Sequence, residues 1–278
     1  MSDRSRSSWL VVAASLALAG VTFWAEGADV AEVGPGARIE LEFPNLPSSL
    51  AGGVSRIVAV LPTTYDPSKT YPLCLWLEGG SGGDGSPRTD LCDPEKYICI
   101  GMPLFRDIGS RKRKSKNKAP PVSGAALHVQ YDDAEVIWPA YKAMIEKLAS
   151  VVPNIAKGKG ILGGFSNGAH CIGVLLTEEG ASVREWFGAF ILAEGGYTLQ
   201  PKRSTLNGCA VVVLAGESSW AVTPFGIDGS RSWTGEEMAK KIKDKGAKTL
   251  YIKMKGVGHA FPNEYVAESR RFLESNGF

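Results

Sequence analysis

The segment Lys159–His170, which reads KGILGGFSNGAH, determines how the rest of the chain is interpreted. A short apolar run is followed by the pattern Gly-x-Ser-x-Gly, centred on Ser166, and then by a helical pattern. This order predicts a sharp turn from a strand into a helix, with the serine lifted above the edge of a sheet. Gly164 and Gly168 lack the Cβ atoms that would clash in so tight a bend. The serine hydroxyl is therefore expected near a helix N terminus, where backbone N–H groups and the helix dipole favour negative charge.

The chain on both sides of this segment alternates short apolar runs with helical patterns. The later runs are continuously apolar, which is typical of strands buried on both faces of a parallel sheet. The expected strands are Arg38–Phe43, Ser55–Leu61, Tyr71–Leu77, Lys96–Gly101, Gly160–Gly163, Phe187–Ala193, Cys209–Ala215 and Thr249–Lys255. The expected helices are Ala134–Val151, Ser166–Thr177, Gly235–Lys245 and Glu264–Ser275, and a capping box formed by Thr234 and Glu237 opens the third. The alternation predicts one α/β domain over residues 36–278, with a mostly parallel central sheet flanked by helices.

The first 28 residues differ in composition from the rest. Arg4 and Arg6 precede an uncharged apolar stretch, Trp9–Ala25, and small residues follow near its end. These are the three parts of a secretory signal, so the mature protein is expected to be secreted or periplasmic. The apolar stretch is about 17 residues long, which is close to the length that spans a bilayer, so an uncleaved membrane anchor is the alternative.

Charge and composition exclude several classes of protein. The 278 residues include 31 basic and 29 acidic side chains, a formal net charge of +2, which produces no field that favours nucleic acid as a partner. Three histidines and five scattered cysteines leave little room for a structural zinc site, and neither a metal nor an organic cofactor is expected. Cys92 and Cys99 lie close enough in sequence to form a disulfide in an oxidising compartment.

A serine hydroxyl needs a positioned base to act as a nucleophile, and the chain has only three histidines. His259 lies directly after the last expected strand and before the last helix, in the kind of loop where α/β folds collect their sites. His170 lies one helical turn after Ser166 and is expected to pack, and His128 is expected to be structural.

A glycine-rich loop, Gly79–Gly85, follows the expected strand Tyr71–Leu77. It lacks the Lys-Ser/Thr ending of a phosphate-binding loop and the spacing of a dinucleotide-binding loop. Backbone N–H groups unhindered by side chains suit a developing negative oxygen, so the loop is predicted to bind an oxyanion.

Six landmarks follow one another along the chain: Tyr65-Asp66-Pro67, Tyr71-Pro72-Leu73, the Gly79–Gly85 loop, Asp132-Asp133, Gly164–Gly168 and Gly258–Pro262. In this order the chain resembles an α/β-hydrolase, and most of all the secreted esterase and polyhydroxybutyrate-depolymerase-like branch, which includes feruloyl and acetyl-xylan esterases. The resemblance covers residues 36–278. It implies that Ser166 is the nucleophile and His259 the general base, with the backbone N–H groups of Gly80 and Asn167 as oxyanion donors.

The chain departs from this family pattern in two places. Glu78 stands where the family usually has a histidine before the oxyanion loop, and Ser219 stands near the usual position of the catalytic aspartate. Three other carboxylates could orient the imidazole and stabilise its cation: Glu194 at the end of the preceding strand, Glu217, and Asp228 further along the loop. Glu194 is preferred, with Glu217 as the second choice.

These observations predict a secreted serine esterase that forms an acyl-enzyme on a small-molecule or polymer-linked ester substrate. No nucleic-acid partner is expected, and a membrane is involved only if the N-terminal segment is uncleaved. One alternative is a catalytically degenerate hydrolase fold that serves as a binding protein, and another is a peptidase of the same fold.

Some residues keep two interpretations. The basic run between Arg111 and Lys118 is interpreted as a solvated surface loop, although a membrane-anchored protein could use it to dock an anionic polymer. Trp220 and Phe225 are expected either to line an acyl or aryl pocket or to pack in the core.

Overall fold

The computed structural model describes residues 33–83, 85–106, 134–197, 199–200, 202–219 and 233–278. The strands are β1 (Arg38–Phe43), β2 (Ser55–Val60), β3 (Tyr71–Leu77), β4 (Ile98–Met102), β5 (Ile155–Phe165), β6 (Phe187–Ala193), β7 (Ala210–Gly216) and β8 (Lys248–Met254). The helices are α1 (Ala134–Val151), α2 (Asn167–Glu178), α3 (Gly180–Val183), α4 (Arg203–Leu206), α5 (Gly235–Asp244) and α6 (Asn263–Ser275). The predictions for residues 1–28, the basic run, His128, Trp220, Phe225 and Asp228 lie outside the described residues.

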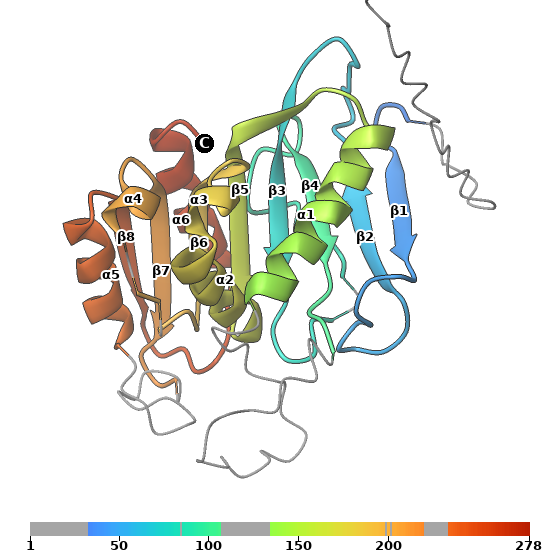
Figure 1. Ribbon diagram of the computed structural model, residues 1–278. Helices are drawn as coiled ribbons and strands as arrows, with labels where there is room; N and C mark the ends of the chain where they lie inside the picture. The colour runs from blue at the N-terminus through green and yellow to red at the C-terminus, as the bar shows by residue number, and fades with distance from the viewer. Residues whose placement is uncertain (1–32, 84, 107–133, 198, 201, 220–232) are drawn as a thin grey trace, which may run out of the picture.

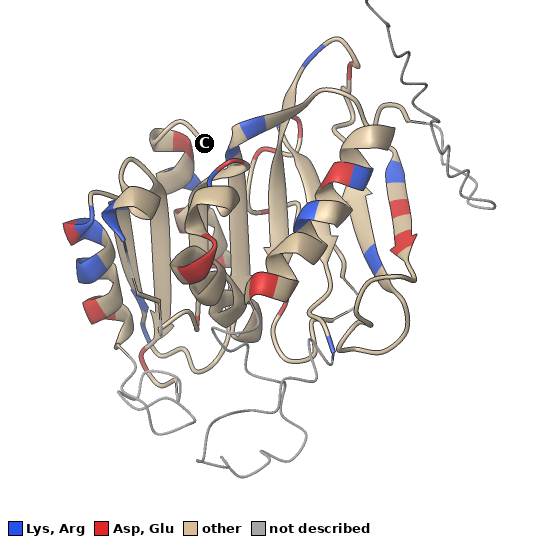
Figure 2. Cartoon of the chain, viewed as in Figure 1, with Lys and Arg blue, Asp and Glu red and all other residues tan. Residues whose placement is uncertain are grey.

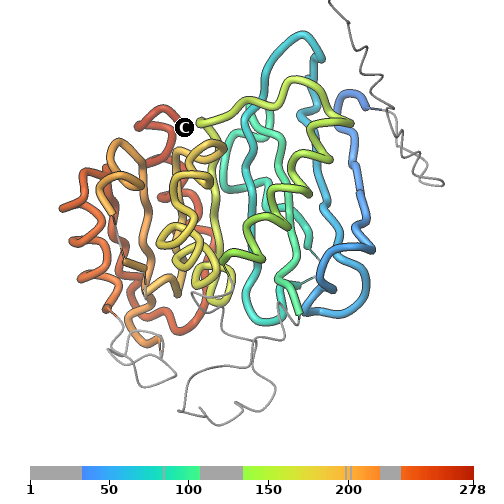
Figure 3. Tube along the Cα trace, viewed as in Figure 1, coloured from blue at the N-terminus to red at the C-terminus, as the bar shows by residue number. Residues whose placement is uncertain are grey.

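The eight strands form one sheet in the order β1-β2-β4-β3-β5-β6-β7-β8 (Figure 1). Strand β2 is antiparallel to both β1 and β4, and every pair from β4 through β3 to β8 is parallel. The predicted α/β domain with a mostly parallel central sheet is confirmed. Because the parallel strands run the same way, the segments that follow β5, β6, β7 and β8 all leave the sheet at one edge (Figure 3).

Helices cover both faces of this sheet, which explains why its central strands are continuously apolar. In β3, Leu73, Leu75 and Leu77 point into one core cluster, whereas Cys74 and Trp76 point into the other. The first cluster includes buried residues of α1, α2 and α5, and the second includes residues of α6. Helices α1, α2 and α5 therefore lie on one face of the sheet and α6 on the other (Figure 1).

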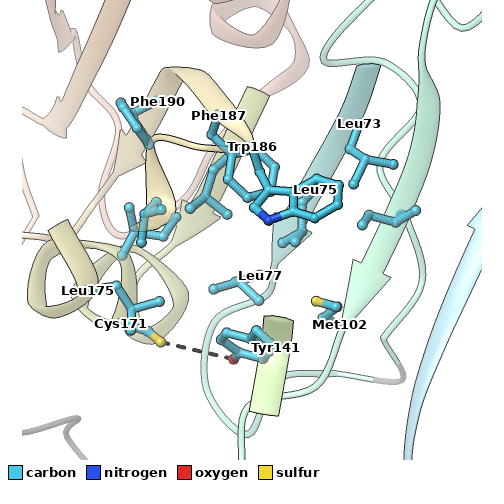
Figure 4. Packing of buried hydrophobic residues seen from close by; sticks show 14 of the residues in the cluster. Leu73, Leu75, Leu77, Met102, Tyr141, Cys171, Leu175, Trp186, Phe187 and Phe190 are labelled. Atoms are coloured by element: carbon cyan, nitrogen blue, oxygen red, sulfur yellow. Dashed lines mark hydrogen bonds between the residues drawn. The ribbon is translucent and has the colours of Figure 1, made fainter. Parts of the chain in front are cut away.

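The larger core is close-packed between α1, α2 and the strands beneath them. Figure 4 shows Leu73, Leu75 and Leu77 of β3 facing aromatic and aliphatic side chains from the neighbouring elements. The Tyr141 hydroxyl, the only polar group of that side chain, has hydrogen-bond partners inside this core. It donates to the carbonyl of Pro103 at 2.8 Å and lies 4.0 Å from the Cys171 sulfur (Figure 4). Burial raises the pKa of this hydroxyl well above its usual value, so it remains a donor.

Charged residues lie on the surface and on the edge strand β1. Strand β1 alternates buried Ile39 and Leu41 with exposed charged residues, as expected for an edge strand that faces solvent on one side. Figure 2 shows the charged residues of β1 and of α5, while the central strands carry none near their middle. Helix α5 begins at the predicted capping box, with the Thr234 side chain accepting from the Glu237 N–H.

The expected element boundaries differ from the structure mainly at β5. This strand begins at Ile155 rather than Gly160, because its first half pairs with Tyr71 and Pro72 before a register shift. That half is largely exposed and contains Gly158 at φ 77°, so it lacks the apolar pattern by which a strand is recognised in sequence. The short helices α3 and α4 were not expected.

All five cysteines are buried free thiols. The Cys92 and Cys99 sulfurs lie 3.6 Å apart without a bond between them. Cys74 pairs in register with Cys99 across β3 and β4. In the part of the chain that the structure describes, no helix is long and apolar enough to cross a bilayer.

Gly101 in β4 is required by a close backbone approach. An added Cβ would lie 2.0 Å from the Gly85 carbonyl oxygen and 2.5 Å from the Ser86 carbonyl carbon. Alanine is a better strand residue than glycine in general, yet we expect Gly101→Ala to lower the free energy of unfolding by about 2–3 kcal/mol through overpacking. Urea denaturation measures the change, with Gly34→Ala as the control because no atom lies within 4 Å of its added Cβ. Equal midpoints for the two variants would contradict the packing described here.

Candidate active site

Ser166 occupies a strained turn between β5 and α2. Its backbone has φ 50° and ψ −113°, a conformation that non-glycine residues rarely adopt. The Ser166 N–H donates to the Ala193 carbonyl at 2.8 Å, and its own carbonyl accepts from the His170 N–H at 2.9 Å. The residue is thus tied to β6 on one side and to the first turn of α2 on the other.

The two glycines that flank Ser166 leave no space for a side chain. A Cβ at Gly168 would lie 2.1 Å from the Leu77 carbonyl oxygen, and one at Gly164 would lie 2.6 Å from the Gly168 carbonyl carbon. Strand β3 and helix α2 therefore approach the turn so closely that only glycine fits. This close approach is the physical reason for the Gly-x-Ser-x-Gly pattern here.

His259, in the segment between β8 and α6, reaches the serine. Its Nε2 lies 2.8 Å from the Ser166 Oγ, and its ring centroid is 5.0 Å from that of Phe165. The His259 side chain is 20% exposed, so it is fixed by packing and still accessible from solvent.

Glu194 completes the line of hydrogen bonds from the other side of the imidazole. It directly follows β6, has φ 55°, and its side chain is fully buried. Its Oε2 lies 3.1 Å from His259 Nδ1 and also accepts from the Ser219 hydroxyl, while its Oε1 accepts from the Gly216 N–H. A buried carboxylate is tolerated when donors surround it in this way.

Glu217, the second choice, points to other partners. Its carboxylate is 41% exposed, forms an ion pair with Lys253 at 3.2 Å and accepts from the Gly256 N–H at 3.1 Å. The Gly256 N–H, and after it Lys253, lower the pKa of this carboxyl. Of the two glutamates, the structure brings Glu194 to the imidazole.

The glycine-rich loop after β3 lies against the serine turn. A Cβ at Gly79 would be 2.6 Å from Phe165 Cδ1 and 3.2 Å from Ser166 Cβ. The Asn167 side-chain amide donates to the Gly80 carbonyl at 2.9 Å, so one residue joins the loop to the start of α2. The backbone N–H groups of Gly80 and Asn167, the predicted oxyanion donors, thus belong to two segments that are held together beside Ser166.

Glu78 supports the start of this loop. Its Oε2 accepts from the Trp76 indole N–H at 2.8 Å, and its Oε1 accepts from the Gly79 N–H at 3.1 Å. The carboxylate therefore fixes the backbone at the point where β3 ends and the loop begins. This gives a structural role to the first departure from the family pattern.

His170 belongs to the packing around the site. Its Nδ1 accepts from the Gly196 N–H at 3.2 Å, and its ring meets Tyr197 edge-on at 6.2 Å. Burial, and secondly the negative charge of Glu194, raise the pKa of the Tyr197 hydroxyl, so this phenol stays protonated near the carboxylate.

Two side chains take part in the hydrogen bonds of the site although the sequence did not predict this role. These are the Asn167 side chain, for which only the backbone was considered, and the Ser219 hydroxyl, which was noted only as a replacement for an acid. Both act through contacts with residues distant in the sequence, Gly80 and Glu194. No local sequence pattern predicts such contacts.

The arrangement is chemically competent for nucleophilic attack by a serine. An imidazole in contact with a hydroxyl can accept its proton, and a buried carboxylate on the opposite ring nitrogen stabilises the resulting cation. Within the described ranges, no cluster of three or more His, Cys, Asp or Glu residues could hold a metal ion.

Solved structures with a similar course of the chain include the Bacillus cereus carboxylesterase, with a TM-score of 0.51 and 16% identity over 80% of this chain and 94% of that one. A mutant of the esterase rPPE aligns with a TM-score of 0.51 and 11% identity, over 87% of this chain and 84% of the other. The chain has the α/β-hydrolase fold. No protein-family model matches the sequence, and the search of curated proteins found no match.

This α/β-hydrolase fold is also found in a protein described as a dipeptidyl aminopeptidase IV from Bacteroides ovatus. It aligns with a TM-score of 0.52 and 14% identity, and the present chain spans 86% of its own length but only 36% of that protein. Identities this low establish the fold and leave the activity to the chemistry of the site. They do not single out the depolymerase-like branch of the esterases.

The contact between Ser166 and His259 predicts selective labelling by a fluorophosphonate probe, which reacts with serines activated by a base. We expect one label per chain, on Ser166, detected by intact-mass and peptide mass spectrometry. Ser166→Ala should abolish it, and Ser218→Ala should not, because Ser218 is an exposed serine of the neighbouring turn. Labelling that persists in Ser166→Ala would contradict the geometry.

Proposed function

We propose that this protein is a serine esterase, a carboxylic ester hydrolase that works through an acyl-enzyme. The observation that carries the proposal is the unbroken line from Ser166 Oγ to His259 Nε2 at 2.8 Å and from His259 Nδ1 to Glu194 Oε2 at 3.1 Å. The three residues follow β5, β6 and β8, so their alignment depends on how these strands are placed in the sheet.

The proposed reaction has two halves. The Ser166 Oγ attacks the ester carbonyl while His259 Nε2 takes its proton, and the backbone N–H groups of Gly80 and Asn167 stabilise the oxyanion. The imidazolium then returns the proton to the leaving alcohol, and the acyl group stays on the serine. Water, deprotonated by the same imidazole, releases the acid and restores Ser166. Glu194 keeps the imidazole in the productive tautomer throughout.

Esters are proposed as the substrates because the carboxylesterase and the esterase rPPE share this fold over 80% and 87% of the present chain. Small-molecule and polymer-linked esters are both compatible with the proposal. The secreted depolymerase-like branch, which the sequence motifs resemble, motivates testing polymer-linked acetyl and feruloyl esters after simple ones.

The alternative of a catalytically degenerate binding protein is not favoured. It was motivated by Glu78 in place of a histidine and by Ser219 in place of an aspartate. In the structure the Glu78 carboxylate accepts from the Gly79 N–H at the start of the loop proposed to bind the oxyanion, and the carboxylate of Glu194 lies against the imidazole. Neither departure leaves the site without a required group.

Hydrolysis of short-chain p-nitrophenyl esters by the purified protein tests the activity. Ser166→Ala should abolish turnover, and Glu194→Gln should lower kcat by about 10³–10⁴-fold because the amide cannot stabilise the imidazolium. Glu217→Gln is the matched control and should keep kcat within about threefold, since an exposed ion pair contributes little.

A reversed order, with Glu217→Gln the more damaging substitution, would show that the acid is assigned wrongly. Equal rates for the folded wild-type protein and Ser166→Ala would contradict the esterase proposal itself.

We also propose that residues 1–28 direct export, which is supported by their sequence pattern alone. Expression of the full chain in a Gram-negative host, followed by fractionation and intact-mass analysis, should yield protein in the periplasm or medium whose N terminus lies near residue 29. Full-length protein in the membrane fraction would instead support an uncleaved anchor. Full-length protein confined to the cytosol would contradict both.

A further inference from the structure

The turn Gly216–Ser219 after β7 holds both oxygens of the Glu194 carboxylate. The Gly216 N–H donates to Oε1 and the Ser219 hydroxyl donates to Oε2. The turn is closed by the Ser219 N–H, which donates to the Gly216 carbonyl at 3.1 Å. The first and last residues of one tight turn therefore hold both carboxylate oxygens of Glu194.

Backbone hydrogen bonds fix this turn relative to the segment that carries His259. The Glu217 N–H donates to the Met254 carbonyl and the Ser218 N–H to the Val257 carbonyl, each at 2.9 Å. Met254 ends β8, and Val257 lies two residues before His259. The distance from the Ser219 Oγ to His259 Nδ1, 3.5 Å, is thus set by the backbone of two adjoining segments.

A glutamate in this position needs more restraint than an aspartate would. Its side chain has one more rotatable bond, and each additional rotor must be fixed for the carboxylate to meet Nδ1 in one geometry. Hydrogen bonds to an ionised oxygen are short and strong, so a hydroxyl that donates to Oε2 supplies such a restraint. Ser219 is only 5% exposed, which protects this bond from competition by water.

We propose that Ser219 is a positioning residue, whose hydroxyl holds Glu194 Oε2 against the Nδ1 side of His259. The inference rests on the proposed function, because it assigns Ser219 a part in the same reaction. The site then combines a carboxylate that follows β6 with a hydroxyl that follows β7.

The test compares kcat and KM for ester hydrolysis in Ser219→Ala, Ser219→Thr and the matched control Ser218→Ala. We expect Ser219→Ala to lower kcat about tenfold, the factor that corresponds to one hydrogen bond to a charged group, with KM within about twofold. Ser219→Thr keeps a hydroxyl and should recover most of the loss, and Ser218→Ala should match the wild type. An unchanged kcat in Ser219→Ala, or an equal loss in folded Ser219→Thr, would overturn the inference.

A double variant decides the matter if the added methyl group of Ser219→Thr prevents folding. Because Ser219 is proposed to act through the Glu194 carboxylate, Ser219→Ala should lower kcat by less than about threefold when Glu194→Gln is already present. A further tenfold loss in Glu194→Gln/Ser219→Ala, relative to Glu194→Gln alone, would show that Ser219 does not act through Glu194 and would overturn the inference.

The rate at which a fluorophosphonate labels Ser166 separates this inference from the proposed function. If the wild type hydrolyses esters and Ser219→Ala matches it in both assays, the inference alone fails. If the wild type hydrolyses no ester but Ser219→Ala slows labelling about tenfold, the esterase proposal fails and the inference stands. If the wild type neither hydrolyses esters nor becomes labelled, both fail.

Discussion

The parallel register of the central strands is the constraint on which the site depends. Phe165 of β5 pairs with Ala193 of β6, and Ala193 pairs with Leu214 of β7. The residues that follow the first two, Ser166 and Glu194, consequently leave the sheet at the same level and side by side. A shift of one strand by one residue would turn its side chains to the opposite face and separate the serine from the carboxylate.

The same register places the proposed acid, Glu194, after β6 and directly beside the turn that follows β7. The Glu194 carboxylate contacts the imidazole and also accepts hydrogen bonds from two residues of the adjoining turn, the Gly216 N–H and the Ser219 hydroxyl. A fully buried carboxylate without such donors would be severely destabilising. The two donors of the turn after β7 therefore allow the carboxylate that follows β6 to be buried.

Much of this arrangement could be predicted from the sequence because it depends on local patterns. The apolar runs located the eight strands, and the Gly-x-Ser-x-Gly pattern placed Ser166 between β5 and α2. The exposed first half of β5 escaped notice, since backbone pairing with Tyr71 holds it rather than an apolar face. The choice of Glu194 over Glu217 was possible from its place at a strand end. The contacts of Ser219 and of the Asn167 side chain were not predictable, because they join residues far apart in the sequence.

Two of the three non-glycine residues with positive φ in the described part of the chain are Ser166 and Glu194, the two ends of the hydrogen-bonded line. The sheet, the helix N terminus and the neighbouring glycines hold these backbones in conformations that an isolated peptide would avoid. Glycine at either position would relax the backbone and remove the functional group at the same time. Thermal stability and the proposed reactivity are thus opposed at these two positions, so selection for a more heat-resistant variant would tend to discard the residues on which the proposed turnover depends.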